Sequence, residues 1–427
     1  MISEIFMLIA LIAFVISSYK RTIWGVAIIV ALLPTYLWRV TLFNLPSTFL
    51  ELMIISLFVI WLLKGKRITK INFSLSKKAY NVLPVKWRYL LVTWLLVSIL
   101  ALVINFTYTS LGLWRAYWLE PIMFFLVFIY SVKSRQDIIN IIKALGVLVI
   151  WLLITTMYQN FSDWNFIAAY NPPNIKRLTG VFSYPNALAL LVAPITALFF
   201  GLWAYSKNKL KEIIYLIAFI AGLILALLSR SDGAILALGL SILLWLILAK
   251  KIRKIGIPLV IMTLIAIVIL PTEKIESALT TNINPKLDLQ SSSVDIRLNQ
   301  WQETTDMLQD NLIFGLGIDG YQDGLLAYHQ YQWLEIYLYP HNIFLNFWTE
   351  LGLAGLIVFL LILISIIYLL KRLFANRSVW AWPLSMMWLT WFIHGLVDVP
   401  YFKNDLSVLF FIMLGLTLVV QQDKKIK

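Results

Sequence analysis

The chain has 427 residues, of which 61% are hydrophobic and only 13% are charged. Soluble domains contain roughly 45–50% apolar and about 25% charged residues, so this composition excludes a water-soluble globular protein. The net charge of +14 does not indicate a nucleic-acid partner, because the Lys and Arg residues lie mostly in short connections between apolar runs. Cysteine is absent, which excludes disulfides, thiolate metal ligands and a cysteine nucleophile.

The apolar runs predict an all-α polytopic membrane protein with about 12–13 transmembrane helices, since one crossing needs about 20 mostly apolar residues. In chain order the predicted spans are 5–19, 22–38, 47–63, 89–105, 115–132, 144–158, 186–205, 212–228, 233–249, 256–270, 342–370, 380–397 and 405–420. The run 342–370 is too long for one crossing at about 1.5 Å per residue. Its first turns are therefore expected to lie along the membrane surface.

The charges predict the orientation of these spans. Alternate connections carry most of the 35 Lys and Arg residues, and the opposite connections carry most of the 21 Asp and Glu residues. The positive-inside rule places the basic connections in the cytoplasm. One of them, 64–88, is expected to lie against anionic membrane lipids.

Three regions follow from this topology. Residues 1–270 form an N-terminal transmembrane bundle of about ten helices with an outer loop at 159–185, residues 271–341 form a large, partly helical extracytoplasmic loop, and residues 342–427 form C-terminal transmembrane helices. Loops longer than about 12–15 residues are commonly functional. The two outer loops are therefore the first places to look for a site.

The positive-inside rule disfavours arginines on the acidic, outer side of the membrane. Arginines that lie there must therefore be favoured by another interaction. Arg177 precedes the span 186–205, Arg230 lies in the polar break SRSDG, and Arg297 lies in DIRLNQWQETTDMLQDN. The apolar residues of that last segment recur at helical spacing and predict an amphipathic helix. Arg presents a planar fork that matches phosphate oxygens, so three of them predict an anion clamp. The alternative is that each arginine pairs with a nearby acid.

His341 lies at the junction between the long outer loop and a span, in the sequence YLYPHNIF. Histidine accepts a proton near neutral pH, which suits a general base that activates a hydroxyl group. Pro340 and Asn342 on either side predict a helix start, where backbone N–H groups favour anions. The alternative is an interfacial histidine with a purely structural hydrogen bond.

Several further polar residues lie near these positions. Asn186, Asn342 and Glu350 are expected to support the site or contact the acceptor, while Gly352 and Gly355 most simply allow close helix packing. Gly315 and Gly317 predict a turn after the amphipathic helix. His394 and Asp398, in WFIHGLVDVPYF, either orient an acceptor or form a structural hydrogen-bonded pair. Because no His, Asp and Glu cluster has metal-ligand spacing, neither a metal nor a cofactor is expected.

Four sequence blocks resemble the O-antigen ligase and O-antigen polymerase superfamily of bacterial membrane glycan enzymes. They are RLTGVFSYPNALA at 177–189, SRSDGA at 229–234, IRLNQWQETTDMLQDNLIFGLGIDGY at 296–321 and PHNIFLNFWTELGLAGLIVF at 340–359. The blocks follow the family order over nearly the whole chain, with a large loop between the second and the fourth.

The resemblance implies a GT-C-like fold and a metal-independent glycosyltransferase in the bacterial plasma membrane, with its site facing the periplasm or cell exterior. Such an enzyme takes a glycan from an undecaprenyl-diphosphate-linked donor and passes it to a hydroxyl of an acceptor glycolipid, such as lipid A core, or of a glycan. Arg177, Arg230 and Arg297 match the family's diphosphate-binding positions, and His341 matches its base.

Other functions remain open at this point. A polymerase of O-antigen or exopolysaccharide and a protein O-oligosaccharyltransferase would use the same donor. A transporter or flippase for the lipid-linked glycan belongs to another class. Transporters usually place ionisable residues near the middle of the bilayer, whereas the arginines and His341 are expected at its outer surface.

Overall fold

The computed structural model describes residues 2–42, 45–71, 83–162, 164–165, 167, 176–248, 293–331 and 333–422. Within these residues the chain is almost entirely helical, with one antiparallel pair of short strands in which Arg39 is opposite Thr48. The predicted all-α fold is therefore confirmed.

The first half of the chain contains α1 (Ile2–Lys20), α2 (Thr22–Ala31), η1 (Leu33–Leu37), β1 (Arg39–Leu42), β2 (Leu45–Thr48), α3 (Phe49–Ile71), α5 (Val85–Ile104), α6 (Tyr108–Trp114), η2 (Arg115–Leu119), α7 (Glu120–Ser131) and α8 (Arg135–Phe161). The second half contains α9 (Pro185–Ala204), α10 (Lys209–Ser229), α11 (Asp232–Leu248), α14 (Ser293–Asp310), α15 (Tyr321–Leu325), η4 (Leu326–Tyr328), α16 (Ile343–Ala375), α17 (Ala381–Gly395) and α18 (Asn404–Gln422).

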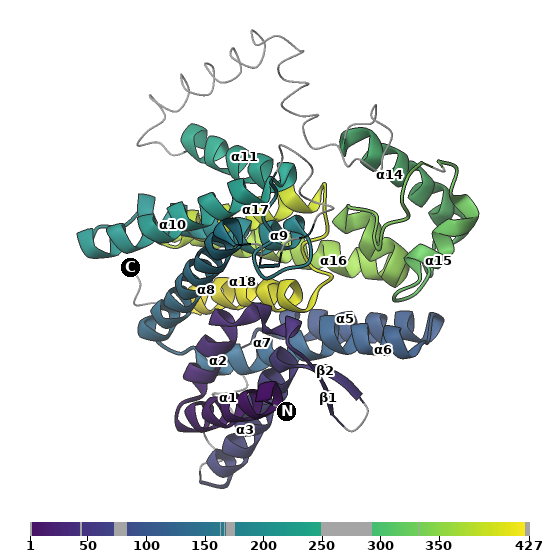
Figure 1. Cartoon of the computed structure of the whole chain (residues 1–427). Helices are drawn as coiled ribbons and strands as arrows, with labels where there is room; N and C mark the ends of the chain where they lie inside the picture. Colours follow the sequence, from purple (N-terminus) through teal and green to yellow (C-terminus); the bar gives the residue numbers. More distant parts are fainter. Residues whose placement is uncertain are drawn as a thin grey trace.

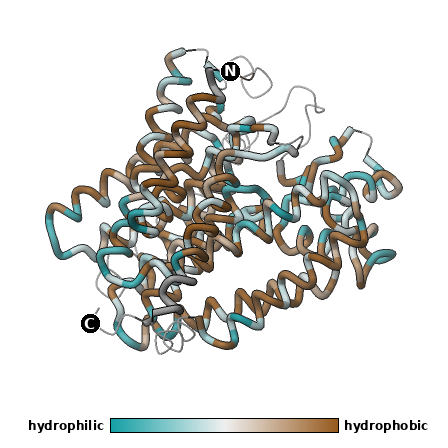
Figure 2. The backbone as a smooth tube through the Cα atoms, turned by 90° about the horizontal axis from the view of Figure 1, so that it is seen from below, coloured by the Kyte–Doolittle hydropathy of each residue, from teal (hydrophilic) through white to brown (hydrophobic). Residues whose placement is uncertain are grey.

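The described part of the chain has seven helical segments that are long and apolar enough to cross a membrane. They are Val85–Ile104, Tyr108–Ser131, Arg135–Phe161, Pro185–Ala204, Lys209–Ser229, Ile343–Ala375 and Asn404–Gln421. Shorter apolar helices occupy Ile5–Lys20, Thr22–Ala31 and Asp232–Leu248. Hydrophobic residues run along these helices, and hydrophilic ones gather at their ends (Figure 2). The predicted span 256–270 and the first part of the predicted outer loop, 271–292, lie outside the described residues.

Two helices form the centre of the bundle. In both α9 and α18, 89% of the most apolar 18-residue stretch is buried inside the protein. The sequence of α9 permits this position because its small residues allow neighbouring helices to come close. A methyl group on Gly201 would lie 2.5 Å from the Cα atom of Pro383 in α17. Replacing this glycine would therefore push α9 and α17 apart.

The long helix α16 is broken at Gly352, where φ is +68° and ψ is −174°. The turn after α14 packs into this break, and the N–H of Leu353 donates to the carbonyl of Ile313 at 3.0 Å. Gly315 and Gly317 in that turn also have positive φ values, which confirms the predicted turn. The predicted role of Gly352 in helix packing was incomplete, because the break needs a left-handed residue and room for the loop.

Several helix ends meet where α14 and α15 lie, and we call this place the α14 end (Figure 1). Contacts between segments place the ends of α10 and α17 here, together with the starts of α9, α11, α16 and α18. Arg115 also lies in this part of the fold. Its guanidinium contacts the carboxylates of Glu51 at 2.7 Å and Glu120 at 2.9 Å, and both acids are almost fully buried. Arg115 therefore forms ion pairs with two buried acids and has a structural role.

Candidate functional site

Arg177 and Arg230 lie next to each other at the α14 end. The N–H of Leu178 donates to the carbonyl of Leu228 at 3.0 Å, and Arg177 Nε donates to the carbonyl of Ser229 at 3.3 Å. Arg230 follows directly and ends α10 in the left-handed conformation, with φ 48° and ψ 42°. Its side chain is exposed. Two cations from distant segments thus share one surface.

Asn186 connects this pair of arginines to the turn between α17 and α18. It lies in the first turn of α9, directly after Pro185, whose fixed φ favours a helix start. Its Oδ1 accepts from a guanidinium nitrogen of Arg177 at 3.2 Å, and its Nδ2 donates to Asp398 Oδ2 at 3.2 Å. One amide therefore orients both a cation and an anion.

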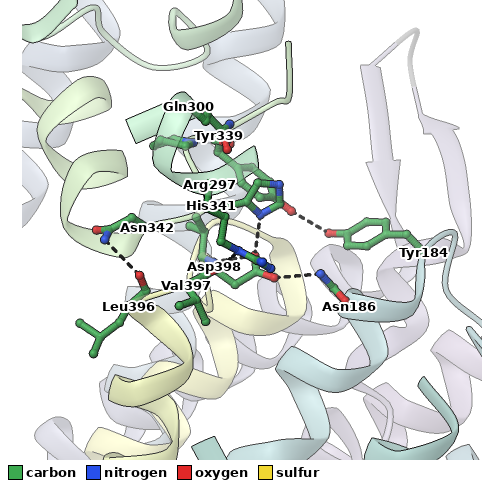
Figure 3. A network of polar contacts seen from close by, with 12 residues as sticks. Tyr184, Asn186, Arg297, Gln300, Tyr339, His341, Asn342, Leu396, Val397 and Asp398 are labelled. Atoms are coloured by element: carbon green, nitrogen blue, oxygen red, sulfur yellow. Dashed lines mark hydrogen bonds and ion pairs between the residues drawn. The ribbon is translucent and has the colours of Figure 1, made fainter. Parts of the chain in front are cut away.

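Asp398 is the centre of the network, and Asn186, Arg297 and His341 approach it from three different segments (Figure 3). Its carboxylate is 2% exposed and accepts from the N–H of Val399 at 2.8 Å. Burial raises the pKa of this carboxyl, but the hydrogen bond and charge of His341, with smaller effects of His394 and Val399, outweigh burial and lower it to about 2. Asp398 is therefore ionised at neutral pH.

His341 contacts Asp398 through its ring. The Nδ1 atom lies 3.3 Å from Asp398 Oδ1, and the rings of Tyr337 and Tyr339 stand edge-on to the imidazole at centroid distances of 5.0 and 5.2 Å. The backbone at His341 has a φ of +46°, which costs a non-glycine residue about 1–2 kcal/mol. Such strain is typical of functional positions. An Nδ1–H that donates to Asp398 leaves Nε2 free to accept a proton.

The predicted helix start after His341 is confirmed. Asn342 caps α16, because its Oδ1 accepts from the N–H groups of Phe344 at 2.9 Å and Leu345 at 3.2 Å. Its Nδ2 donates to the carbonyl of Leu396 at 3.1 Å. Asn342 thus ties the start of α16 to the end of α17.

Arg297 comes from α14, the amphipathic helix that the sequence predicted. Its Nε donates to the carbonyl of Val397 at 2.9 Å, directly beside Asp398 (Figure 3). The same helix docks on the loop before His341, since Gln300 Nε2 donates to the carbonyl of Tyr339 at 2.8 Å and Trp301 Nε1 donates to that of Pro340 at 2.8 Å. The helix α14 therefore fixes Arg297 and His341 relative to each other.

Two other predicted site residues lie outside this hydrogen-bonded network. His394 is 1% exposed, and neither ring nitrogen has a hydrogen-bond partner among the described residues. Asp398 bonds His341 instead, so the predicted structural pair of His394 and Asp398 does not form a hydrogen bond. Glu350 is buried in α16 beside Asp319.

The sequence interpretation missed two tyrosines of the site. The hydroxyl groups of Tyr184 and Tyr339 lie 3.2 Å apart and share a hydrogen bond, which links the start of α9 to the loop before His341. Each tyrosine directly precedes a proline at or just before a helix start, in SYPN and YPHN. That shared pattern is the signal that could have identified them.

The described residues contain no group of three or more His, Asp or Glu side chains that could hold a metal ion. What they do bring together is a cationic surface next to a histidine and carboxylate pair, at one end of a multi-pass membrane protein. A family model described as O-antigen ligase matches residues 217–360, about a third of the chain. No curated protein matches the sequence.

Over residues 217–360 the match confirms the predicted resemblance to the O-antigen ligase and O-antigen polymerase superfamily. It supports membrane glycan processing of the ligase or polymerase type. The matched region includes Arg230, Arg297 and His341, whereas Arg177 and Asp398 lie outside it and join the site through the fold.

Proposed function

We propose that the protein is a glycosyltransferase that moves a glycan from an undecaprenyl-diphosphate-linked donor to the hydroxyl of an envelope acceptor, outside the bacterial plasma membrane. The observation that carries this proposal is the hydrogen-bonded network from Arg177 through Asn186 and Asp398 to His341, with Arg297 beside it. It combines anion-binding groups with a base, and this is what glycosyl transfer from a diphosphate requires.

In the proposed reaction, the acceptor oxygen forms a bond to the anomeric carbon while the bond from that carbon to the phosphate oxygen breaks. His341 Nε2 takes the proton of the acceptor hydroxyl, and undecaprenyl diphosphate leaves with the bonding electrons. Direct displacement of this kind inverts the anomeric centre. Asp398 keeps the Nδ1–H of His341 in place and stabilises the imidazolium as it forms.

The arginines act on the leaving group. Negative charge grows on the diphosphate as the sugar departs, so guanidinium groups fixed beforehand stabilise the transition state more than the ground state. Arg177 is fixed by Ser229 and Asn186, and Arg297 is fixed by Val397. Arg230 is exposed and adjoins Arg177, so it is suited to contact the donor directly. No step of this reaction requires a metal.

The test is glycan transfer by the purified protein in lipid nanodiscs, with a synthetic undecaprenyl-diphosphate glycan as donor. We expect His341→Ala and Arg297→Ala to insert and fold but to lose transfer. Full activity in either variant would remove that residue from the mechanism. Incubation with donor alone separates the two main activities, because a polymerase lengthens the donor glycan and a ligase needs a second substrate.

A further inference from the structure

A buried lysine packs against Tyr184, one of the tyrosines of the candidate site. Lys403 ends the turn between α17 and α18 and is 9% exposed. Its Nζ atom is fully buried and has no hydrogen-bond partner among the described residues. Lys403 has no part in the proposed transfer reaction, so its presence needs another explanation.

Aromatic rings surround this ammonium group. Nζ lies over the rings of Phe182 at 4.5 Å, Tyr36 at 5.3 Å and Tyr184 at 5.8 Å, within the range of cation–π attraction, about 6 Å. Asp405 Oδ1 is 3.3 Å from Nζ, a longer distance than the roughly 2.7–2.9 Å of a strong charge-assisted hydrogen bond.

This arrangement is a poor way to stabilise a fold. Burial lowers the pKa of Lys403, against the opposing effect of Asp405, because burial disfavours the charged ammonium group. A buried ion pair that lacks good hydrogen bonds is often no more stable than a neutral pair of the same size. Ionisable groups whose pKa is shifted by burial are common at functional sites.

The segment that packs against Lys403 is directly connected to the candidate site. Phe182 and Tyr184 belong to the turn before α9. This turn brings the Tyr184 hydroxyl within 3.2 Å of the Tyr339 hydroxyl and Asn186 within 3.2 Å of Asp398. Both contacts converge on His341. The ammonium group of Lys403 packs against Phe182 and Tyr184 and therefore fixes the turn 182–186. This turn supports His341 through Tyr339 and through Asp398.

We propose that Lys403 is a positioning residue, whose ammonium group fixes the turn 182–186 and thereby the orientation of the His341 imidazole. The proposal rests on the proposed function only for its effect on the rate of glycan transfer. The geometric consequence, one fixed tautomer of His341, holds whatever reaction the protein catalyses.

The test variant is Lys403→Met combined with Asp405→Asn, which replaces the ion pair by neutral side chains of similar size. We expect its thermal stability to equal or exceed that of the wild type, its kcat for glycan transfer to fall about 10-fold through misplacement of the base, and its KM for donor to change less than about twofold. Lys64→Met is the matched control. Lys64 lies over the ring of Tyr19 at 5.2 Å, far along the sequence from the site residues.

Histidine-labelled ¹⁵N NMR spectra give a readout that is independent of activity. The chain has three histidines, and His341→Gln assigns the signal of His341. We expect one tautomer, with Nδ1 protonated, in the wild type and in Lys64→Met, and a mixture in the double variant. A wild type that transfers no glycan would refute the proposed function but leave this comparison intact. An unchanged His341 signal, or a loss of thermal stability that accounts for the lost activity, would overturn the role of Lys403.

Discussion

Replacing Asp398 by asparagine is expected to disable His341 without unfolding the protein. The pKa of about 2 for this carboxyl, against an ordinary value near 3.8, corresponds to about 2–3 kcal/mol in favour of the carboxylate. This contribution to stability is complete above about pH 4 and is lost only as the pH falls toward 2. Titration of Asp398 therefore cannot affect activity near neutral pH, and an effect of the substitution there reflects its contacts with His341, Asn186 and Val399.

The amide that replaces the carboxylate would donate an N–H to His341 Nδ1. The imidazole proton would then move to Nε2, and no base would face the acceptor. General-base catalysis typically contributes about 10²–10⁴ in rate, so kcat should fall at least about 100-fold. His341 Nδ1 and the N–H of Val399 both contact Oδ1 of Asp398, so an amide nitrogen that faces His341 loses the hydrogen bond from Val399. The amide oxygen, in the place of Oδ2, still accepts from Asn186 Nδ2.

The assay is glycan transfer from the diphospholipid donor, together with a thermal melting curve in the same nanodiscs. Asp310→Asn is the matched control, because Asp310 also accepts one side-chain hydrogen bond, from Tyr328 at 2.6 Å, but is exposed and outside the network. Asp398→Asn with the kcat of the wild type would refute the assignment of His341 as the base.

Three other substitutions test separate features. Arg177→Lys keeps the charge but loses the planar fork that contacts Ser229 and Asn186, so kcat should fall about 10-fold in the transfer assay, whereas Lys176→Arg should have no effect. Gly352→Ala should lower the free energy of unfolding by about 2 kcal/mol or more in denaturation experiments, because the left-handed break leaves no room for a methyl group; Gly239→Ala, with open space around it, should be tolerated. Arg115→Met should destabilise the protein by about 3–5 kcal/mol, since two buried glutamates lose their cation, and an unchanged melting temperature would contradict this structural role.

The sequence predicted most of the helices because apolar runs and membrane thickness leave few other solutions. The predicted span 22–38 was wrong in its second half, since α2 ends at Ala31 and the 3-10 helix η1 follows. It also predicted α14 from its helical spacing and the start of α16 from Pro340 and Asn342. Alternation of spans implied that Arg177, Arg230 and His341 share one side of the membrane. These features depend on local patterns or on the bilayer, and both are visible without the fold.

The contacts between distant segments were not predictable in this way. Asn186 and Asp398 are 212 positions apart, and only the packing of α9 against α17 brings them together. The sequence left open whether His394 and Asp398 orient an acceptor or form a structural hydrogen-bonded pair. However, α17 ends at Gly395, so Asp398 lies beyond the helix and turns toward His341. The break at Gly352 depends on a loop that comes from α14, which the sequence of α16 alone cannot indicate.

The proposed function depends above all on binding of the donor's diphosphate by the arginines at the α14 end. Binding of undecaprenyl diphosphate without a glycan, measured in nanodiscs for the wild type, Arg177→Ala and Arg297→Ala, tests it most directly. We predict at least about 10-fold weaker binding in both variants, from the loss of charge-assisted hydrogen bonds, and no change in Arg377→Ala, which is exposed beyond the other end of α16. Equal affinity in all four proteins would contradict the claim.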